Sequence, residues 1–501
     1  MFEYSGTMVW MKKFFLYLTV FITGMCVMAI EMTASRFLAP FFGASILVWS
    51  SIIGVVMAAL ALGYFYGGKF ADHYGNSTKP LFLVIFITGI FVDLVAFFGR
   101  SLLRDFALSA GGDSFGVIFG SLFATVILFA IPLIFLGMVS PMAARIGVEK
   151  NTDNVGSVVG NLYAFSTVGS LFGVFLPALV MIPFIGTART FIVFGTVLIL
   201  LGAAGLRSII ALLAVIISAV LALSVPVTLY ADNPAVIAEV ESSYNTIHVR
   251  EDGDGTRYMV INDGRGVQSQ YREGEVLTGR YWDAVALGPL LNPEIKNMLV
   301  LGVAGGTSLR VAHHFYPELI IDGVDVDEAV FDLAKRFFAL PQDDNVRLFA
   351  SDGRLFVAEK ENDSYDFVMI DTYTKEIDIP FHLATREFFH DIDRVLSSSG
   401  IMLINIAVMG SRTEVAEAIT NTVAEVFPHT YHFWFPGTSS WLVFASNEDF
   451  MKDAVNVNRV PDPRLASIFS QFKKDAVVVS HNPQAMYFTD DRAPIELLSR
   501  L

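Results

Sequence analysis

The sequence predicts an α-helical polytopic membrane domain followed by a Rossmann-like α/β domain, with a small β-region at the start of the second half. The chain has 501 residues, more than one compact domain usually contains. Its mean hydropathy of +0.56 is too high for a wholly soluble protein. Charge is also divided: residues 1–230 carry a net +3 and the remainder −18, of a total of −15. We therefore expect domains at 1–230, 231–292 and 293–501.

The first half contains six or seven apolar stretches that approach or exceed the ~20 residues needed to cross a bilayer. They lie at 14–34, 46–68, 81–99, 115–138, 155–181, 190–206 and 208–229. Only Arg207 separates the last two, which form either a tight hairpin or one bent element. The first is not a cleavable signal peptide, because no small-residue cleavage site is evident and more spans follow. The lipid bilayer is thus an expected partner.

The membrane orientation follows from two arguments that disagree. Lys and Arg residues favour a cytoplasmic N-terminus, with seven on one set of loops and four on the other. Seven spans would then place the second half outside the cell, whereas an enzyme that uses a nucleotide is expected inside. An error of one in the number of spans reconciles them, so we expect a multi-pass protein of the cell membrane with a cytoplasmic catalytic domain.

Two acids fall within the apolar stretches, Glu31 in the first and Asp93 in the third. Intramembrane acids are energetically costly and often functional. The alternative for Glu31 is a structural pair with Arg36, one turn later. The single cysteine, Cys26, excludes an intramolecular disulfide and a cysteine-based metal site, and no metal is predicted.

The acidic second half argues against nucleic-acid binding, which needs clustered Lys and Arg. Its charge suits a cationic small molecule, although acidic surfaces also serve solubility. Residues 231–292 include the β-rich runs "NTIHVRED" and "TRYMVIND". Gly-Asp-Gly at 253–255 lies between these runs and predicts a hairpin turn.

From Asn297 onward, strand-like and helix-like segments alternate. Five apolar runs predict strands: "NMLVLGVAGG", "LIIDGVDVD", "NVRLFASDGR", "YDFVMIDTY" and "GIMLINIAV". Repeated strand–helix units imply a parallel, doubly wound sheet, and such sheets bind ligands at the carboxyl ends of their strands.

The predicted strand ends carry glycine or acid. Gly302 and Gly305 lie in the first turn, where backbone can approach a ligand closely. Asp325 ends the second strand, where an acid can bind the two ribose hydroxyls of a nucleoside. Asp352, before Gly353, ends the third, where a carboxylate can accept from an adenine amino group.

Asp371 ends the fourth strand and would face the same crevice, beside the reacting centre. The first turn reads "GVAGGTS", which does not fit the G-x-G-x-x-G spacing that a dinucleotide pyrophosphate needs. An adenosine sulfonium needs only ribose and adenine contacts. The pattern therefore favours a domain of the S-adenosylmethionine methyltransferase type over one that binds NAD.

Several segments between 240 and 410, and one near the C-terminus, resemble the spermidine synthase (polyamine aminopropyltransferase) family in its membrane-fused form. The similar segments are "ESSYNTI", "VINDGRGVQS", "LGVAGGTSLR", "VDVDEAV", "SDGRLFV", "YDFVMIDTYTKE" and "YFTDDRAPIE". The resemblance implies that Asn245 contacts the nucleoside ligand, and that Tyr244, Gln268, Asp283 and Tyr373 contact the amine substrate.

The resemblance also implies a reaction. A diamine such as putrescine attacks the carbon beside the sulfonium of decarboxylated S-adenosylmethionine, and methylthioadenosine leaves. Decarboxylated S-adenosylmethionine, or S-adenosylmethionine itself, is then a co-substrate, and no prosthetic group is expected. Asp371 is the expected catalytic residue, since an aspartate must accept the proton of the attacking amine. Family members are often oligomers, so a homo-oligomer is compatible with the resemblance.

The chain departs from the family at four positions. Gly305 replaces an aspartate, Asn245 a glutamine, Trp282 a histidine and Thr374 a second acid. The residues predicted to contact adenosine match the family better than the residues predicted to contact the polyamine. Two alternative functions therefore remain. One is an S-adenosylmethionine-dependent methyltransferase or another transferase with a non-polyamine acceptor. The other is a polyamine transporter or sensor whose binding domain does not catalyse. His382 is either a second proton relay or a residue that caps or packs a turn.

Overall fold

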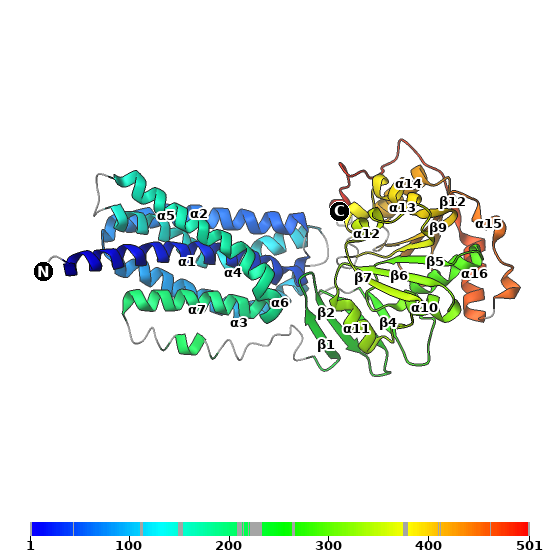
Figure 1. The fold of residues 1–501 in the computed structure, drawn as a ribbon, viewed down its shortest axis with the longest axis horizontal. Helices are drawn as coiled ribbons and strands as arrows, with labels where there is room; N and C mark the ends of the chain where they lie inside the picture. Colours follow the sequence, from blue (N-terminus) through cyan, green and yellow to red (C-terminus); the bar gives the residue numbers. More distant parts are fainter. Residues whose placement is uncertain are drawn as a thin grey trace. The chain divides into compact units, whose positions relative to one another are not determined.

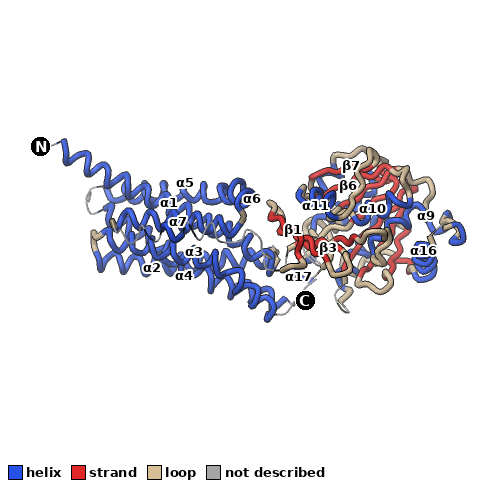
Figure 2. The backbone as a smooth tube through the Cα atoms, turned by 90° about the horizontal axis from the view of Figure 1, so that it is seen from below, coloured by secondary structure: helices blue, strands red, loops and turns tan. Residues whose placement is uncertain are grey.

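The computed structural model forms two compact units, Met1–Ala231 and Asp232–Leu501 (Figure 1). It describes residues 3–43, 45–110, 114–148, 154–207, 213, 215–218, 220, 233–262, 266–373, 379–408, 410, 412–460 and 462–498. The first unit is helical and the second is a mixed α/β structure (Figure 2).

The helical unit contains long helices that lie side by side (Figures 1 and 2). Their bounds are α1 Glu3–Phe42, α2 Ile46–Tyr74, α3 Thr78–Ala110, α4 Ser114–Val148, α5 Val155–Leu176 with the short η2 Pro177–Met181 and α6 Ile182–Ile185, and α7 Thr187–Leu206. Among the described residues, six stretches are long and apolar enough to cross a membrane: Phe14–Phe42, Ile46–Tyr74, Thr78–Leu103, Phe119–Val148, Val155–Ile185 and Thr187–Leu206. The first six predicted stretches are confirmed as such helices, and the seventh, 208–229, lies mostly outside the described residues.

Small residues let the helix backbones of this unit approach each other. A Cβ added to Gly169 of α5 would overlap the carbonyl oxygen of Phe21 on α1, and one on Gly173 would overlap that of Met25. Such small-residue contacts replace the hydrophobic driving force that is missing between helices in lipid.

The second unit begins with a four-stranded antiparallel sheet in the order β1-β2-β3-β4. The strands are β1 Val236–Glu241, β2 Thr246–Glu251, β3 Arg257–Ile261 and β4 Ser269–Tyr271. The predicted turn at 253–255 joins β2 to β3, with Gly255 at φ 80° and the Asp252 N–H donating to the Thr256 carbonyl at 2.9 Å. Glycine suits this turn because the left-handed region costs it little.

The larger sheet has eight strands in the order β12-β10-β11-β9-β8-β5-β6-β7. The bounds are β5 Asn297–Leu301, β6 Ile320–Asp325, β7 Val346–Ala350, β8 Tyr365–Ile370, β9 Leu396–Ala407, β10 His429–Trp434, β11 Ser440–Ser446 and β12 Val477–Val479. The five predicted strands, β5 to β9, are parallel as expected. β11 runs antiparallel to both β9 and β10, so the sheet is mixed.

Helices pack on both faces of this sheet. Their bounds are η3 Tyr281–Leu287, α9 Gly288–Leu291, α10 Thr307–Phe315, α11 Ala329–Phe337, α12 Gly353–Ala358, η4 Phe381–Leu383, α13 Arg386–Val395, α14 Glu414–Val426, α15 Phe450–Asp453, η5 Val457–Arg459, α16 Pro463–Asp475 and α17 Ile495–Leu498. Alternate residues of β5 enter different cores: Met298 packs in a cluster with Leu309 of α10, and Leu299 in one with Phe388 of α13. This period of two is the pattern of a strand buried on both faces.

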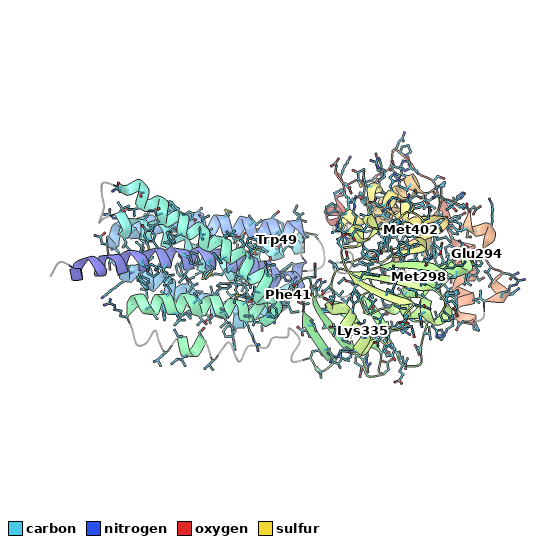
Figure 3. All side chains as sticks on the ribbon, in the orientation of Figure 1. Phe41, Trp49, Glu294, Met298, Lys335 and Met402 are labelled. Atoms are coloured by element: carbon cyan, nitrogen blue, oxygen red, sulfur yellow. The ribbon has the colours of Figure 1, made fainter. Side chains whose placement is uncertain are left out.

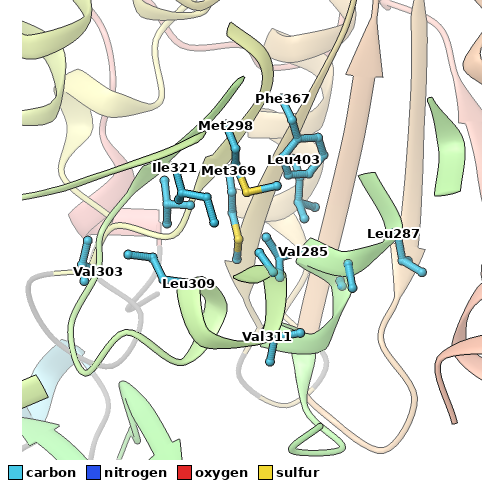
Figure 4. Close-up of a cluster of buried hydrophobic side chains, with 14 of the residues drawn as sticks. Val285, Leu287, Met298, Val303, Leu309, Val311, Ile321, Phe367, Met369 and Leu403 are labelled. Atoms are coloured by element: carbon cyan, nitrogen blue, oxygen red, sulfur yellow. The ribbon is translucent and has the colours of Figure 1, made fainter. Parts of the chain in front are cut away.

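The core cluster on the α10 side is drawn in Figure 4, where side chains from β5, β8 and β9 meet those of η3 and α10. Met298 of β5 and Met402 of β9, both labelled in Figure 3, are fully buried. Met402 packs in the core on the opposite face, whereas Phe367 of β8 joins Met298 on the α10 side, where its ring lies against Gly288 and an added Cβ would come within 2.7 Å of it. This packing holds the central strands, and hence their carboxyl ends, in place.

We predict that Phe367→Ala destabilises the α/β unit by about 3–5 kcal/mol, because the 0% exposed ring leaves a cavity that tight packing cannot close. Phe381→Ala makes the same truncation at a ring that is 50% exposed, and should change stability far less. Thermal unfolding of the detergent-purified full chain measures both. Equal shifts for the two variants would contradict this account of the core.

Candidate active site

The ends of β5, β6 and β8 are joined at the backbone around Gly302. Its N–H donates to the Val324 carbonyl at 2.8 Å, and the Asp371 N–H donates to the Leu301 carbonyl at 2.8 Å. Gly302 has φ 88°, and an added Cβ would overlap the carbonyl oxygen of Asp371. Only glycine fits here, because the backbone is left-handed and lies against a neighbouring strand end. The structure thus brings Gly302 and Asp371 together, as the sequence predicts.

Asp325 lies beside the same turn at the end of β6. Its Oδ2 accepts from the Val303 N–H at 3.1 Å and the Ala304 N–H at 3.0 Å, while Oδ1 accepts from the Asp327 N–H at 3.1 Å. Burial raises the pKa of Asp325, although these backbone donors favour its charged form. A carboxylate has about four lone-pair sites and these bonds use three, so one site on Oδ1 remains for a ribose hydroxyl, and a second hydroxyl would share an oxygen with the backbone donors.

The β-region contributes Asn245 to the β6 end. The Asn245 Nδ2 donates to Asp327 Oδ2 at 3.3 Å, and its Oδ1 accepts from Asn262 Nδ2 at 3.1 Å. Asn245 therefore contacts Asp327, which follows Asp325 by two residues, near the expected nucleoside position. Tyr244 next to it is 54% exposed, so its ring is accessible to a ligand.

Asp352 caps the N-terminus of α12, at the end of β7. Its Oδ1 accepts from the backbone N–H groups of Arg354 at 2.9 Å and Leu355 at 3.1 Å. Its Oδ2 lies 3.1 Å from His382 Nε2, so His382 pairs with Asp352. This contact supports the capping or packing role of His382. Gly353 follows, and an added Cβ there would make only ordinary contacts of 3.6 Å or more.

The carboxylate of Asp371 is hydrogen-bonded by two side chains. Asn405 Nδ2, from β9, donates to Asp371 Oδ1 at 2.9 Å, and the Tyr281 hydroxyl also hydrogen-bonds the carboxylate. Burial raises the pKa of Asp371 to about 6, while these two hydrogen bonds act to lower it. Such a pKa leaves the group charged at neutral pH and still able to take up a proton.

Sequence reasoning did not select Tyr281 or Asn405. Tyr281 directly precedes Trp282 and Asp283 in the sequence, and Asn405 is a polar residue inside an apolar strand, 2% exposed. Asn405 Oδ1 is buried and has no hydrogen-bond partner among the described residues. An amide side chain inside an otherwise apolar strand is the sequence feature that indicates a special role for Asn405.

Tyr373 lies close to this network but does not offer its hydroxyl to a ligand. The hydroxyl donates to the Asn405 carbonyl at 2.8 Å and accepts from the Ala407 N–H at 2.8 Å. Burial raises the pKa of Tyr373. The arrangement supports a role in positioning Asn405, and the expected contact of Tyr373 with an amine stays a prediction.

Asp283 is also turned toward the protein. It is 0% exposed, and its carboxylate accepts from the Thr278 N–H and hydroxyl, at 2.9 and 3.0 Å, and from the Gly279 N–H at 2.7 Å. Asp283 therefore fixes the loop that leads into Tyr281, and contact with an amine substrate would require those bonds to open. Gln268 is half-buried, and its N–H donates to the Met259 carbonyl at 2.8 Å.

The turn at Gly305 is occupied by a neighbouring side chain. The Gly305 N–H donates to Ser269 Oγ at 2.8 Å. An added Cβ at Gly305 would come within 2.6 Å of the Ser269 Cβ and 3.1 Å of the Phe338 ring. The turn thus has no room for the aspartate that the family resemblance places here. Thr374, where the family has a second acid, lies outside the described residues.

Comparisons with known proteins identify the domain that carries this site. Residues 283–453 match the family described as "Spermine/spermidine synthase domain". The "Probable polyamine aminopropyl transferase" of Bifidobacterium longum is 32% identical over 281 residues, which cover 52% of this chain and 61% of that protein. The "Polyamine aminopropyltransferase" of Vibrio vulnificus is 28% identical over 224 residues, or 42% of this chain and 72% of that protein.

A probable spermidine synthase from Corynebacterium glutamicum is a structural neighbour, with a TM-score of 0.42 and 18% identity over 50% of this chain and 96% of its own. This chain spans 61% of the length of the Bifidobacterium relative. Residues 283–453 therefore match a spermine/spermidine synthase domain, and the resemblance predicted from the sequence is confirmed for that part.

We predict that Gly302→Ala weakens binding of methylthioadenosine at least about tenfold, because a left-handed non-glycine residue costs about 1–2 kcal/mol even before the overlap with the Asp371 carbonyl. Gly253→Ala is the matched control, because its added Cβ would meet no atom within 4 Å and it lies in the turn between β2 and β3, and it should bind within about twofold of the unsubstituted chain. Calorimetry on the full chain measures both affinities. Equal losses would show that the Gly302 turn does not border the ligand.

Proposed function

We propose that the chain is an aminopropyltransferase that uses decarboxylated S-adenosylmethionine and a diamine such as putrescine. The observation that carries this proposal is the Asp371 carboxylate, held by Asn405 and Tyr281 next to the Gly302 turn. The proposal also rests on the family match and on the named activity of the two relatives.

In this proposal the adenosyl group lies across the strand ends. Asp325 accepts from the ribose hydroxyls and Asp352 is placed to accept from the adenine amino group. The sulfonium then lies near Gly302, where the absence of a side chain lets the ligand approach the backbone. The electron-poor carbon beside the sulfur faces Asp371.

The reaction joins the amine nitrogen to that carbon. The carbon–sulfur bond breaks, its electron pair stays on sulfur, and neutral methylthioadenosine leaves. The amine loses one proton, and Asp371 accepts it. A diamine is cationic in water, with amine pKa values near that of lysine at about 10.4. A buried carboxylate close to the amine therefore both attracts the ammonium form and removes its proton.

A second candidate reaction is methyl transfer from S-adenosylmethionine. One observation favours it: Ser269 occupies the space at Gly305 where the family places an acid for the amine-bearing end of the decarboxylated ligand. The two candidates share the crevice and Asp371 but differ in donor, so an assay with each donor separates them.

We further propose that the six long apolar helices anchor the enzyme in the cell membrane as a multi-pass protein, with its catalytic unit in the cytoplasm. The length and composition of the helices support the anchoring. The nucleoside co-substrate supports the cytoplasmic side. A homo-oligomer is proposed only by analogy with soluble members of the family.

We predict that Asp371→Asn lowers methylthioadenosine release by about 10²–10⁴-fold, because the amide cannot accept the amine proton. Binding of methylthioadenosine should persist. Asp363→Asn makes the same change in an exposed turn and should retain activity. The measurement is product release from decarboxylated S-adenosylmethionine and putrescine by the purified full chain. Undiminished release by Asp371→Asn would contradict the assigned role, and release of S-adenosylhomocysteine from S-adenosylmethionine alone would favour methyl transfer.

The pKa of Asp371 predicts the pH dependence. Because only the carboxylate accepts a proton, activity should fall with unit slope below about pH 6. Asn405→Ala removes a hydrogen bond to the charged form, worth about 1.5–3 kcal/mol. The pKa of Asp371 then rises, and the acid limb of the pH–activity profile moves to higher pH by about one to two units. Asn362→Ala, at an exposed position, should leave the limb unchanged. A limb that stays in place in Asn405→Ala would show that another group controls it.

A further inference from the structure

The helical unit carries a groove between α2 and α4, beside the carboxyl-terminal part of α2. The groove has a volume of about 520 Å³, within the range of roughly 300–1,000 Å³ that is typical of small-molecule sites. The α2 side is lined by Tyr66, Lys69, Phe70, His73 and Tyr74. Spacings of three and four residues place these five side chains on one face of the helix. The proposed reaction uses none of them.

Close packing at glycines produces the groove. A Cβ added to Gly63 would overlap the carbonyl oxygen of Ile134, and one on Gly67 would come within 2.6 Å of the Cα of Met138. The two helix backbones therefore touch, and the larger side chains on either side of the contact stand apart. Ile134, Phe135 and Met138 form the α4 wall. The groove is thus apolar on α4 and carries its polar groups on α2.

Lys69 gives the groove a positive charge. Its ammonium lies over the Phe65 ring, 4.1 Å from the centroid, and an aromatic ring does not neutralise that charge. Within the described residues, the lining contains no Asp or Glu, and Asp72 lies about 100° around the helix from His73. His73 lies in the last turn, where a basic side chain also offsets the helix dipole. Lys69, one turn earlier, is therefore the residue that most directly favours an anion.

Tyrosine hydroxyls and apolar surface lie next to this charge. Tyr66 is 51% exposed and Tyr74 is 46% exposed, and each can donate a hydrogen bond. Tyrosine is enriched where the headgroups of a bilayer meet its apolar core, and lysine places its ammonium at the same level. Phe70, 38% exposed, continues the apolar surface of α4. A phosphate joined to acyl chains matches both parts of the groove, whereas an inorganic anion would leave the apolar part uncovered.

We propose that this groove binds one anionic phospholipid. The phosphate lies against the Lys69 ammonium and the His73 ring, and the acyl chains lie along Phe70 and the α4 wall. Basic pockets between membrane helices suit anionic headgroups, and the cationic group of a zwitterionic lipid would be repelled by Lys69. The groove therefore discriminates among lipids by charge. This inference rests on the proposed anchoring in the membrane and is independent of the proposed transfer reaction.

Native mass spectrometry of the detergent-purified full chain tests the lipid preference. The chain is mixed with phosphatidylglycerol or with phosphatidylcholine that has the same acyl chains, and bound lipid is counted. We expect at least about fivefold more phosphatidylglycerol than phosphatidylcholine on the chain. Lys69→Gln should weaken phosphatidylglycerol binding about fivefold, the factor expected for one basic residue beside an anionic headgroup. Equal binding of the two lipids by the unsubstituted chain would overturn the proposal.

Lys79→Gln is the matched control for the position of the site. It makes the same change at an exposed lysine in the first turn of α3, outside the groove lining. Binding of phosphatidylglycerol by this variant should stay within about twofold of the unsubstituted chain. Equal losses in Lys69→Gln and Lys79→Gln would show that the charge of this helix end, and not the groove, attracts the lipid, and would contradict the assigned site.

Cell fractionation separates this site from the anchoring on which it rests. We expect the unsubstituted chain and Lys69→Gln in the membrane fraction after a carbonate wash, because six long apolar helices outweigh one groove charge. A membrane-bound chain that binds both lipids equally would overturn the groove alone. A chain in the soluble fraction would overturn the anchoring together with this site.

Discussion

The close approach of two strand ends at Gly302 is the constraint on which the candidate site depends. Because this residue has no side chain, the carbonyl of Asp371 lies directly against the turn that follows β5. Any larger residue would push the backbone of Asp371 away from this turn. The buried core under β5 and β8 keeps these ends aligned, so packing far from the crevice also fixes its geometry.

A second set of contacts places the side chains around Asp371. Asp283 holds the loop that precedes Tyr281, and Tyr373 hydrogen-bonds the backbone of Asn405 and Ala407. Tyr281 and Asn405 then hydrogen-bond the carboxylate itself. Asp283 and Tyr373, which the sequence predicts to contact substrate, thus hydrogen-bond the backbone beside Tyr281 and Asn405. Interior hydrogen bonds of this kind preserve the orientation of a catalytic group that has little contact with solvent.

The sequence predicted the parts of this structure that depend on local pattern. Apolar runs marked β5 to β9, and the residues directly after four of them lie along one edge of the sheet, as parallel topology requires. The antiparallel strands β10 to β12 were not predicted, since their placement depends on pairing with distant strands. The orientations of Asp283 and Tyr373 depend on backbone partners, which residue type does not reveal. Likewise, the space at Gly305 is filled by Ser269, 36 positions earlier in the chain.

A structure of the full chain bound to methylthioadenosine and a diamine tests the central claim most directly. Our account predicts the ribose hydroxyls on Asp325, the sulfur beside Gly302, and one amine nitrogen about 3 Å from a carboxylate oxygen of Asp371. An adenosine bound away from this turn, or an amine with no contact to Asp371, would contradict it.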